Sequence, residues 1–402
     1  MTATTEKPTD PMPRSMADGG QALLTWLARR PNPVSYDAHA KAWHVTGYAE
    51  VMAVLMDPET FSSDFSGLVP PAPGRDRFMT GNFVGMDDPE HRKLRKLVSQ
   101  AFTPRMVAGL EPRIREISAG LLADLGKRET FDLVSDFAYP LPVIVIAEML
   151  GIPIADRDRF RAWADTLLDV EAPESLDDLG EVLDGQEPVF HEMADYLLER
   201  IAEKRANPGD DLISKLCVVE VDGESLTDEE MVGFVALLLL AGHITTTALL
   251  GNTFLCLAEN PAAAAALRAD RSLVPAAVEE VLRVRSPFTR VARVTTREVE
   301  FAGQTIPAGV FVLPWLMAAN RDPRVFADPD RFDIRREGKQ LAFGHGVHVC
   351  IGAPLARLEA RVAVPLLLDH FADIEVVADE ATFYESNGMV SAKHLPLRVR
   401  AA

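Results

Sequence analysis

The longest run of apolar residues lies near the middle of the chain. From Met231 to Ala258 no residue carries a formal charge. Thr227, followed three positions later by Glu230, has the pattern of a capping box, and Asn260-Pro261 ends the run. We therefore expect a single helix of about 33 residues, roughly 50 Å long at the usual rise per residue.

The length and apolar character of this run also match a membrane span. Its centre, however, contains His243 and three successive threonines, Gly251-Asn252-Thr253 follows, and the flanking residues are acidic rather than basic. A helix that is hydrophobic on nearly all sides is typical of the core of a large protein. We therefore expect a buried core helix.

Other segments predict shorter elements. The sequence AAVEEVLRVRSP predicts a helix that ends before Pro287, and a helical run from Ala353 to His370 contains Pro365, which should kink the helix or end it early. β-Branched and aromatic runs predict short strands. These strands are Ala42–Val45, Val299–Phe301, Phe311–Pro314 and Leu395–Val399. The pattern as a whole predicts a mainly α fold with a small β-rich portion.

Composition narrows the class of protein. The chain of 402 residues is 48% hydrophobic, and we expect one domain over residues 17–402 after a flexible N-terminal arm at residues 1–16. Its formal charge of −19, from 41 basic and 60 acidic residues, argues against binding to nucleic acid or to an anionic membrane. Three scattered cysteines give no disulfide framework and no secretory signal is recognisable, so we expect a cytoplasmic location.

The segment FGHGVHVCIG, residues 343–352, carries the most specific chemical signal. Cys350 lies in a glycine-rich loop directly before a predicted helix that begins at Ala353-Pro354, and the positive end of that helix favours a thiolate. Gly346 and Gly352 allow the backbone to turn tightly and to lie close to a flat macrocycle. A thiolate held in this way suits axial ligation of haem iron. The alternative is a free thiol that packs as a small hydrophobic group.

This loop resembles the haem-binding loop of the cytochrome P-450 family, whose pattern is Phe-x-x-Gly-x-(Arg or His)-x-Cys-x-Gly. Every defined position is matched, by Phe343, Gly346, His348, Cys350 and Gly352. The resemblance implies the fold of that family, a large helical haem domain with a small β-rich portion. It also implies haem b as cofactor, with Cys350 as the ligand of the iron.

A second motif lies in the long apolar helix. The sequence AGHITT, from Ala241 to Thr246, is similar to the family's oxygen-binding stretch, in which Gly242 would open a groove beside the iron and Thr245 would help to deliver protons. The usual acidic position is Ile244, so we expect proton relay through Thr245, ordered water and substrate hydroxyls. Threonines that only bond the helix backbone are the alternative interpretation. The residues implied in oxygen activation are Thr245, Ala241, Gly242 and Thr246.

Two further sets of residues fit the same family. Glu280 and Arg283 match its Glu-x-x-Arg pair, which would lock the haem-binding core, although such a pair taken alone is usually a solvated salt bridge. His91 and Arg95, four apart on one helix face, match residues that hold the haem propionates. The set implied around the propionates is His91, Arg95, Arg293 and His348.

Other basic residues predict a docking surface for an electron donor. On a chain of net charge −19, a basic patch near the thiolate side of the haem would receive an acidic electron-transfer protein, and a solvated basic face is the alternative. We expect ferredoxin and ferredoxin reductase as partners. The patch residues are Arg92, Lys93, Lys96, Arg357 and Arg361.

Together the motifs predict an oxygen-inserting enzyme. They occur in family order from about Leu24 to Val399, and AGHITTT and PEHRKLRKLVSQAFTPR resemble macrolide-tailoring hydroxylases of the erythromycin-pathway type. The resemblance implies hydroxylation or epoxidation of a bulky natural product, above all a macrolide, with O2. Alternatives are tailoring or cross-linking of a cyclic nonribosomal peptide, a peroxide-driven peroxygenase, and a haem-dependent binding protein without turnover.

Apolar residues predict the substrate pocket. Leu237, Ala241 and Thr245 recur at helical spacing, and family analogy adds wall residues from other segments, although such residues are more often plain core. The loop from Phe65 to Met86 is the expected lid. The candidate pocket residues are Phe83, Val84, Leu237, Ala241, Ile244, Phe288, Val291, Met389 and Val390.

Overall fold

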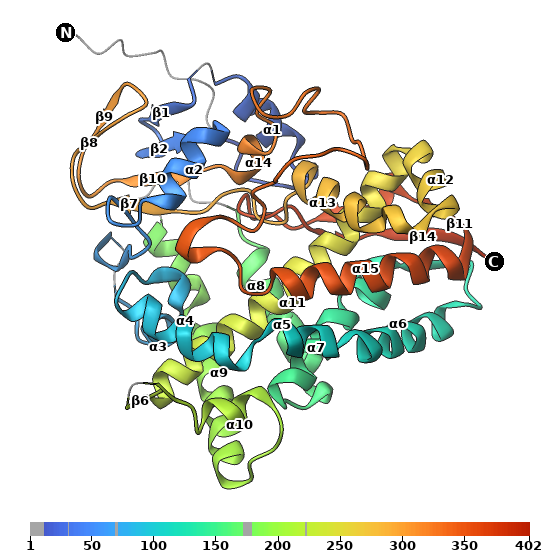
Figure 1. The fold of residues 1–402 in the computed structure, drawn as a ribbon, viewed down its shortest axis with the longest axis horizontal. Coiled ribbons are helices and arrows are strands. Elements are labelled where there is room, and N and C mark those ends of the chain that lie inside the picture. The colour runs from blue at the N-terminus through green and yellow to red at the C-terminus, as the bar shows by residue number, and fades with distance from the viewer. Residues whose placement is uncertain (1–11, 31, 69–70, 172–178, 222) are drawn as a thin grey trace.

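A computed structural model describes residues 12–30, 32–68, 71–171, 179–221 and 223–402. Helices make up most of the molecule, and α11 crosses its centre (Figure 1). The α-helices are α1 (Gln21–Ala28), α2 (Tyr48–Met56), α3 (Pro73–Thr80), α4 (Glu90–Ala101), α5 (Pro104–Gly109), α6 (Glu111–Leu125), α7 (Pro140–Leu150), α8 (Arg157–Leu168), α9 (Leu179–Ala206), α10 (Leu212–Leu216), α11 (Asp228–Glu259), α12 (Pro261–Ala269), α13 (Val274–Val284), α14 (Leu316–Ala319) and α15 (Ala353–His370).

The strands form small sheets rather than one large one. The five-stranded sheet has the order β1-β2-β10-β7-β3, with β2 and β10 parallel, and it lies on one side of the helices (Figure 1). The strands are β1 (Val34–Asp37), β2 (Ala42–Val45), β3 (Phe61–Ser62), β4 (Thr130–Asp132), β5 (Glu220–Val221), β6 (Glu224–Ser225), β7 (Arg293–Thr295), β8 (Val299–Phe301), β9 (Gln304–Ile306), β10 (Phe311–Pro314), β11 (Phe371–Val376), β12 (Thr382–Phe383), β13 (Ala392–His394) and β14 (Pro396–Ala401). The four predicted strands are all present, the last beginning one residue late.

The predicted central helix is confirmed as α11. The Thr227 hydroxyl accepts the Glu230 N–H (3.1 Å), and the Glu230 carboxylate accepts the Thr227 N–H (2.8 Å), which completes the expected capping box. Among the described helices, α11 is the one long and apolar enough to cross a membrane, and most of it is buried inside the protein. It packs against α3, α7, α9 and α15, as expected of a core helix.

Two sequence predictions about chain ends and helix ends need correction. The helix α15 continues through Pro365 to His370, so of the two predicted outcomes, a kink or an early end, the early end does not occur. The predicted N-terminal arm extends too far: Met16 is buried and its N–H donates to the Glu385 carbonyl (3.2 Å). Residues 1–11 of that arm lie outside the described residues.

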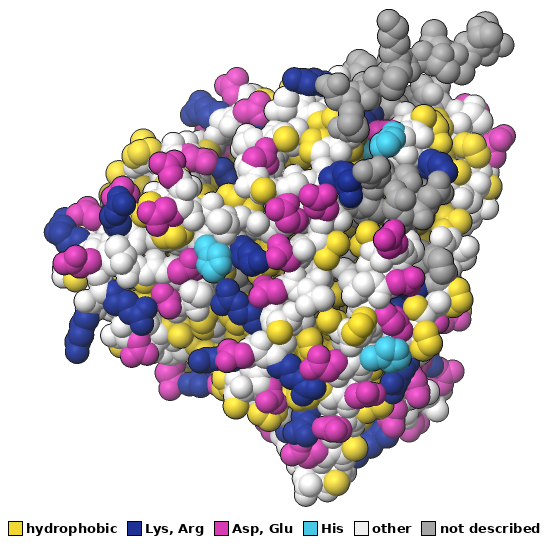
Figure 2. All heavy atoms as spheres, turned by 180° about the vertical axis from the view of Figure 1, so that it is seen from behind, with side chains coloured by type: hydrophobic (Ala, Val, Ile, Leu, Met, Phe, Trp, Pro, Cys, Tyr) yellow, Lys and Arg dark blue, Asp and Glu magenta, His cyan; other side chains and the backbone are white. Residues whose placement is uncertain are grey.

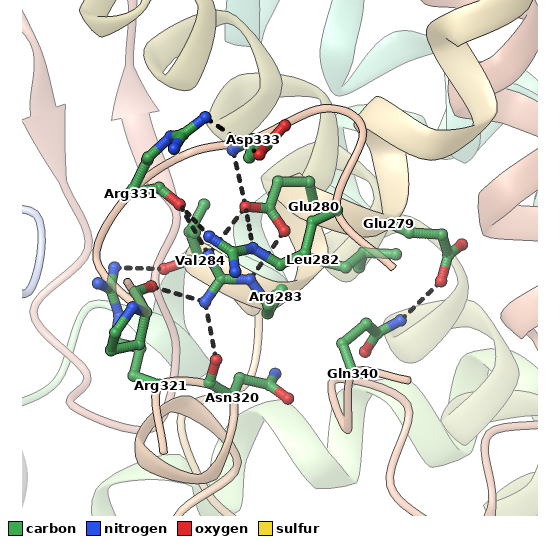
Figure 3. Close-up of polar contacts among 12 residues, drawn as sticks. Glu279, Glu280, Leu282, Arg283, Val284, Asn320, Arg321, Arg331, Asp333 and Gln340 are labelled. Carbon is green, nitrogen blue, oxygen red and sulfur yellow. Dashed lines mark hydrogen bonds and ion pairs between the residues drawn. The ribbon is translucent and has the colours of Figure 1, made fainter. Parts of the chain in front are cut away.

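A buried ion pair on α13 organises the segment that leads to the cysteine loop (Figure 3). The Arg283 guanidinium donates two bonds to the Glu280 carboxylate, both 2.8 Å long, and the two side chains are only 2% and 3% exposed. Arg283 also donates to the carbonyls of Asn320 (2.9 Å), Pro329 (2.7 Å) and Arg331 (3.1 Å). Glu280 and Arg283 therefore form a buried ion pair and not the solvated salt bridge that their spacing alone suggests.

The same network continues to the cysteine loop. The Glu280 carboxylate accepts the Asp333 N–H (2.8 Å) and the Arg336 side chain (3.1 Å). The Asn320 side chain accepts the Leu341 N–H (2.7 Å), two residues before the loop begins. The loop therefore starts from a backbone position that α13 holds indirectly.

Removing the guanidinium should destabilise the protein strongly. Arg283→Ala leaves the Glu280 charge buried without its partner, which typically costs about 3–5 kcal/mol in unfolding free energy. Arg331→Ala is the matched control, because its side chain is 67% exposed and makes only a pair with the Asp333 side chain (3.3 Å), while the backbone carbonyl that Arg283 binds is retained. Urea unfolding followed by circular dichroism measures both. Equal losses of stability in the two variants would contradict this account.

Candidate active site

The cysteine loop is held by backbone contacts on both sides. Gly346 has φ +71°, and a Cβ there would lie 2.3 Å from the Leu55 carbonyl oxygen of α2, so only glycine fits. The Cys350 N–H donates to the Phe343 carbonyl (2.9 Å), which closes the loop. Gly352 has an ordinary φ of −80°, and a Cβ there would lie 3.8 Å from the Cys350 sulfur. The tight turn expected at both glycines is therefore required only at Gly346.

The Cys350 thiol faces a cavity and is accessible from it, unlike Cys256, which is packed in the core. Burial among protein atoms raises the pKa of the Cys350 thiol above its ordinary value. The N–H groups of Gly352 and Ala353 at the start of α15 lower the pKa, as do the charges of Arg95 and Arg357. The sulfur is thus placed as an available ligand rather than as a core-packing group.

Four basic side chains gather beside the loop. The rings of His91 and His348 lie 4.2 Å apart, and His348 Nε2 lies 2.9 Å from the Ser63 hydroxyl. Arg95 donates to the Val349 carbonyl (2.5 Å), and Arg293 donates to the carbonyl of the residue before it (2.7 Å). Within the described ranges, no carboxylate lies within 4 Å of either guanidinium.

This cluster has unused hydrogen-bonding capacity that suits an anion. His91 Nε2 and His348 Nδ1 are buried and have no hydrogen-bond partner among the described residues. Burial lowers the pKa of His348 to about 3, with Arg293, His91 and Arg95 adding to the effect, and burial lowers the pKa of Arg293 to about 10. A bound carboxylate would supply the missing acceptors and offset the crowded positive charge. The arrangement fits the two carboxylates of haem next to a thiolate ligand.

The opposite wall of the cavity belongs to α11. Ala241, Gly242, Thr245 and Thr246 all line it, and a Cβ on Gly242 would approach the Ile146 side chain of α7 to 3.0 Å. The Thr245 hydroxyl donates to the Ala241 carbonyl (2.8 Å), and α11 is a continuous helix through this stretch. Thr245 is therefore at the cavity surface, with its hydroxyl bonded to the helix backbone.

His243 does not face the cavity. It is fully buried against Tyr139, with Nδ1 2.5 Å from the Leu239 carbonyl oxygen, and burial lowers its pKa to about 4. A neutral imidazole on the far side of the helix cannot take the place of the missing acid, in agreement with the separation of about 100° between neighbouring residues.

Comparison with known proteins agrees with this geometry. A model of the cytochrome P-450 family matches residues 24–396. The erythromycin C-12 hydroxylase of Saccharopolyspora erythraea is 46% identical over 385 residues, which cover 94% of each chain. The cyclomarin C epoxidase CymV of Salinispora arenicola is 43% identical and covers 96% of this chain and 98% of its own. The structure of a mutant of EryK in complex with erythromycin B has a TM-score of 0.88 at 45% identity, covering 97% of this chain and 99% of EryK.

The chain belongs to the cytochrome P-450 family. It is a monooxygenase with haem b as its cofactor. When bound, haem iron with O2 and two electrons supplies the oxidation chemistry. Cys350 is the side chain that would hold the iron, and His91, Arg95, Arg293 and His348 would hold the propionates. Phe343 lines the cavity, and the Arg357 guanidinium lies over its ring at 4.4 Å.

The cavity of this cytochrome P-450 is broad and mainly apolar. It encloses about 430 Å³ between α11, the residues after α3, the segment after α13 and the cysteine loop. Six of the nine predicted pocket residues line it: Phe83, Val84, Leu237, Ala241, Phe288 and Val291.

The other three predicted pocket residues do not line the cavity. Ile244 packs against the main hydrophobic core, because it lies on another face of α11. Met389 is buried behind Phe288, with which it forms an antiparallel bridge, so it supports the wall from outside. Val390 is buried in a separate cluster with Trp315.

The predicted basic patch is largely neutralised. Arg92 pairs with Asp88, Lys93 lies 2.8 Å from Glu224, and Arg357 makes a bidentate pair with Glu279 (2.6 and 2.9 Å). Sequence reasoning missed Glu224 and Glu279 because they come from other parts of the chain, and it overlooked Asp88, which lies four residues before Arg92. The Arg361 side chain donates to the Arg357 carbonyl (3.2 Å). The face in Figure 2 likewise shows basic and acidic side chains intermixed.

Sequence reasoning also missed a buried carboxyl behind α11. Glu359 of α15 is 1% exposed, and burial raises its pKa to about 8, although the Thr246 hydroxyl lowers it somewhat. The Thr246 hydroxyl does not form a hydrogen bond of good geometry with Glu359, and neither Glu359 carboxyl oxygen has a hydrogen-bond partner in the described chain. The raised pKa favours the protonated, neutral form of Glu359 near pH 7. No sequence signal marks it, because glutamate in a helix is normally solvated.

Replacing Cys350 should remove thiolate ligation. Cys350→Ala is expected to lose the red-shifted absorption band of the reduced carbon monoxide complex, because an alanine offers no sulfur to the iron. Cys256→Ala is the control, since that thiol is buried in the core and away from the cavity. Retention of the band in Cys350→Ala would exclude Cys350 as the ligand.

Glu359 should make stability depend on pH. Its pKa is raised from 4.5 in the unfolded chain to about 8 on folding, so its contribution to stability is full below pH 4.5 and is lost as pH rises through about 8. Glu359→Gln should lose less unfolding free energy than the wild type across this window. Chemical denaturation at several pH values measures the difference, with the exposed Glu375→Gln as control. Parallel curves for wild type and Glu359→Gln would contradict the raised pKa.

Proposed function

We propose that this cytochrome P-450 hydroxylates or epoxidises a bulky natural product, most simply a macrolide intermediate. Electrons would come from a ferredoxin and its reductase. The observation that carries the proposal is the mainly apolar cavity between Cys350 and the small residue Ala241, which the haem and an apolar substrate would share. The kinship to the erythromycin C-12 hydroxylase supports a macrolide, and that to the cyclomarin C epoxidase supports epoxidation as a second reaction.

The site residues divide the work in this proposal. Cys350 ligates the iron, and the four basic groups hold the propionates. Thr245 offers a hydroxyl at the cavity surface that can exchange its bond to the Ala241 carbonyl for one to water or substrate. Proton supply then depends on water and substrate hydroxyls, because Ile244 points into the core and His243 is neutral and buried.

The alternatives predict different observables. A cyclic peptide would fit the same apolar cavity. A peroxygenase would turn over faster with peroxide than with a reductase system, but it offers no reason for Thr245 to line the cavity. A cross-linking oxidase would join rings without adding oxygen to the product. A binding protein would show ligand shifts and no turnover.

A spin-state titration tests the substrate class directly. We expect a saturable low-to-high-spin shift with a macrolide, because a bulky ligand displaces water beside the iron, and turnover with ferredoxin and reductase should add one oxygen atom to the product mass. A shift with a cyclic peptide and none with any macrolide would retain the enzyme class and reject the macrolide. Products without added oxygen would reject monooxygenation of that substrate.

A further inference from the structure

One polar side chain in the cavity wall is left without a function in the proposed reaction. Most of the polar lining groups surround Cys350 or belong to Thr245 and Thr246 on α11. The Arg290 guanidinium donates to the Asn387 carbonyl (2.9 Å) and side-chain oxygen (2.8 Å). Asn82, in the predicted lid after α3, also lines the cavity and is only 8% exposed.

The orientation of the Asn82 amide is fixed by its own backbone neighbours. Its Oδ1 accepts the Val84 N–H (3.2 Å) and caps the short 3-10 turn Phe83–Gly85. The oxygen is thereby committed, so the NH2 group must point the other way. It approaches the Met79 sulfur at 3.7 Å, and Met79 itself lines the cavity.

The NH2 group is poorly satisfied where it stands. A thioether sulfur is a weak acceptor, and no oxygen or nitrogen acceptor for Asn82 Nδ2 is found in the described chain. Buried amide N–H groups normally donate to an oxygen or nitrogen acceptor, because a buried donor without a hydrogen bond is unfavourable. An apolar cavity with one such donor is the usual design for orienting a bulky ligand.

The position of Asn82 is also rigid. A Cβ on the preceding residue, Gly81, would lie 1.9 Å from the Glu230 carbonyl oxygen, and one on Gly233 would lie 2.4 Å from the Gly81 nitrogen. The loop is therefore pressed backbone to backbone against the first turns of α11. A donor held in this way loses little freedom when a ligand binds, so its hydrogen bond contributes to selectivity.

We propose that the Asn82 NH2 group donates a hydrogen bond to a carbonyl oxygen of the substrate and thereby sets which carbon faces the haem. The inference rests on the proposed function, and it narrows the substrate to macrocycles with a lactone, ketone or amide carbonyl. Asn82 acts as a specificity residue, because it contacts the substrate away from the carbon that reacts. Macrolides and cyclic peptides share this chemistry, so the donor does not choose between them.

A matched pair of probes isolates the hydrogen bond. Cyclopentadecanone and cyclopentadecane have the same ring size and differ by one carbonyl. Their dissociation constants follow from spin-state titrations of the haem-loaded protein. The wild type should bind the ketone about threefold to tenfold more tightly than the hydrocarbon, the range that one neutral hydrogen bond gives. A ratio near one in the wild type would overturn the proposal.

Two substitutions separate the donor from the turn cap. Asn82→Asp keeps an acceptor for the Val84 N–H and loses the donor, whereas Asn82→Ala loses both. Both variants should lower the ketone-to-hydrocarbon preference to about one or below. Met79→Leu removes the sulfur, leaves the donor, and should retain the wild-type preference. Because each result is a ratio, a general disturbance of the loop cancels.

An unchanged preference in Asn82→Ala, even with both affinities reduced, would show that Asn82 only caps the turn. Failure of the proposed function would appear elsewhere, as a wild-type enzyme that adds no oxygen to any macrolide or cyclic peptide. That failure would leave the probe ratios as they are.

Discussion

The buried guanidinium of Arg283 fixes the segments from which the cysteine loop departs. It gathers three backbone carbonyls from the stretch between α14 and the loop, and its partner Glu280 holds the Asp333 N–H. Without this group, those carbonyls and the Glu280 charge would be buried without partners, which is far more costly than the loss of a surface salt bridge. The position of Cys350 thus depends on a cation that never touches the cavity.

The polar groups of the cavity are strongly segregated. The basic side chains His91, Arg95, Arg293 and His348 are concentrated beside the cysteine loop, where their mutual repulsion and burial make them a site for carboxylates. The remaining walls are mainly apolar, so charges there would interact strongly and be poorly screened. Burial raises the pKa of Glu359, an acid packed behind α11, and favours its neutral form. Local electrostatics would therefore hold an anionic cofactor at one end and, under the proposed function, suit a neutral substrate at the other.

Much of the fold and of the cofactor site could be predicted because short-range rules decide them. The capping box at Thr227, the apolar run of α11 and the motif around Cys350 each carry their signal within a few residues. The glycine at position 346 could be predicted from the motif, although the cause of the requirement, the Leu55 carbonyl, comes from α2.

The failures share a different origin, because tertiary partners decided them. The acids that neutralise Lys93 and Arg357 could not be assigned from spacing, because Glu224 and Glu279 lie far away in the sequence. Family analogy assigned Met389 and Val390 to the cavity wall, but both are buried behind it. Met16 was predicted to belong to a flexible arm, but it is packed in a hydrophobic cluster. A pattern of apolar residues identifies buried positions, but it does not tell a cavity wall from a core.

Selectivity in such a cavity must come from few groups. Apolar walls discriminate weakly between bulky ligands, since one methylene in such a pocket changes affinity only modestly. A site with a buried hydrogen-bond donor discriminates more sharply, because a ligand without an acceptor leaves that donor without a hydrogen bond. The Asn82 NH2 group, held against α11 and paired only with sulfur, is placed to provide this discrimination. Proteins that share the cysteine loop can then differ in substrate through the lid, where the polar groups are not needed for the haem.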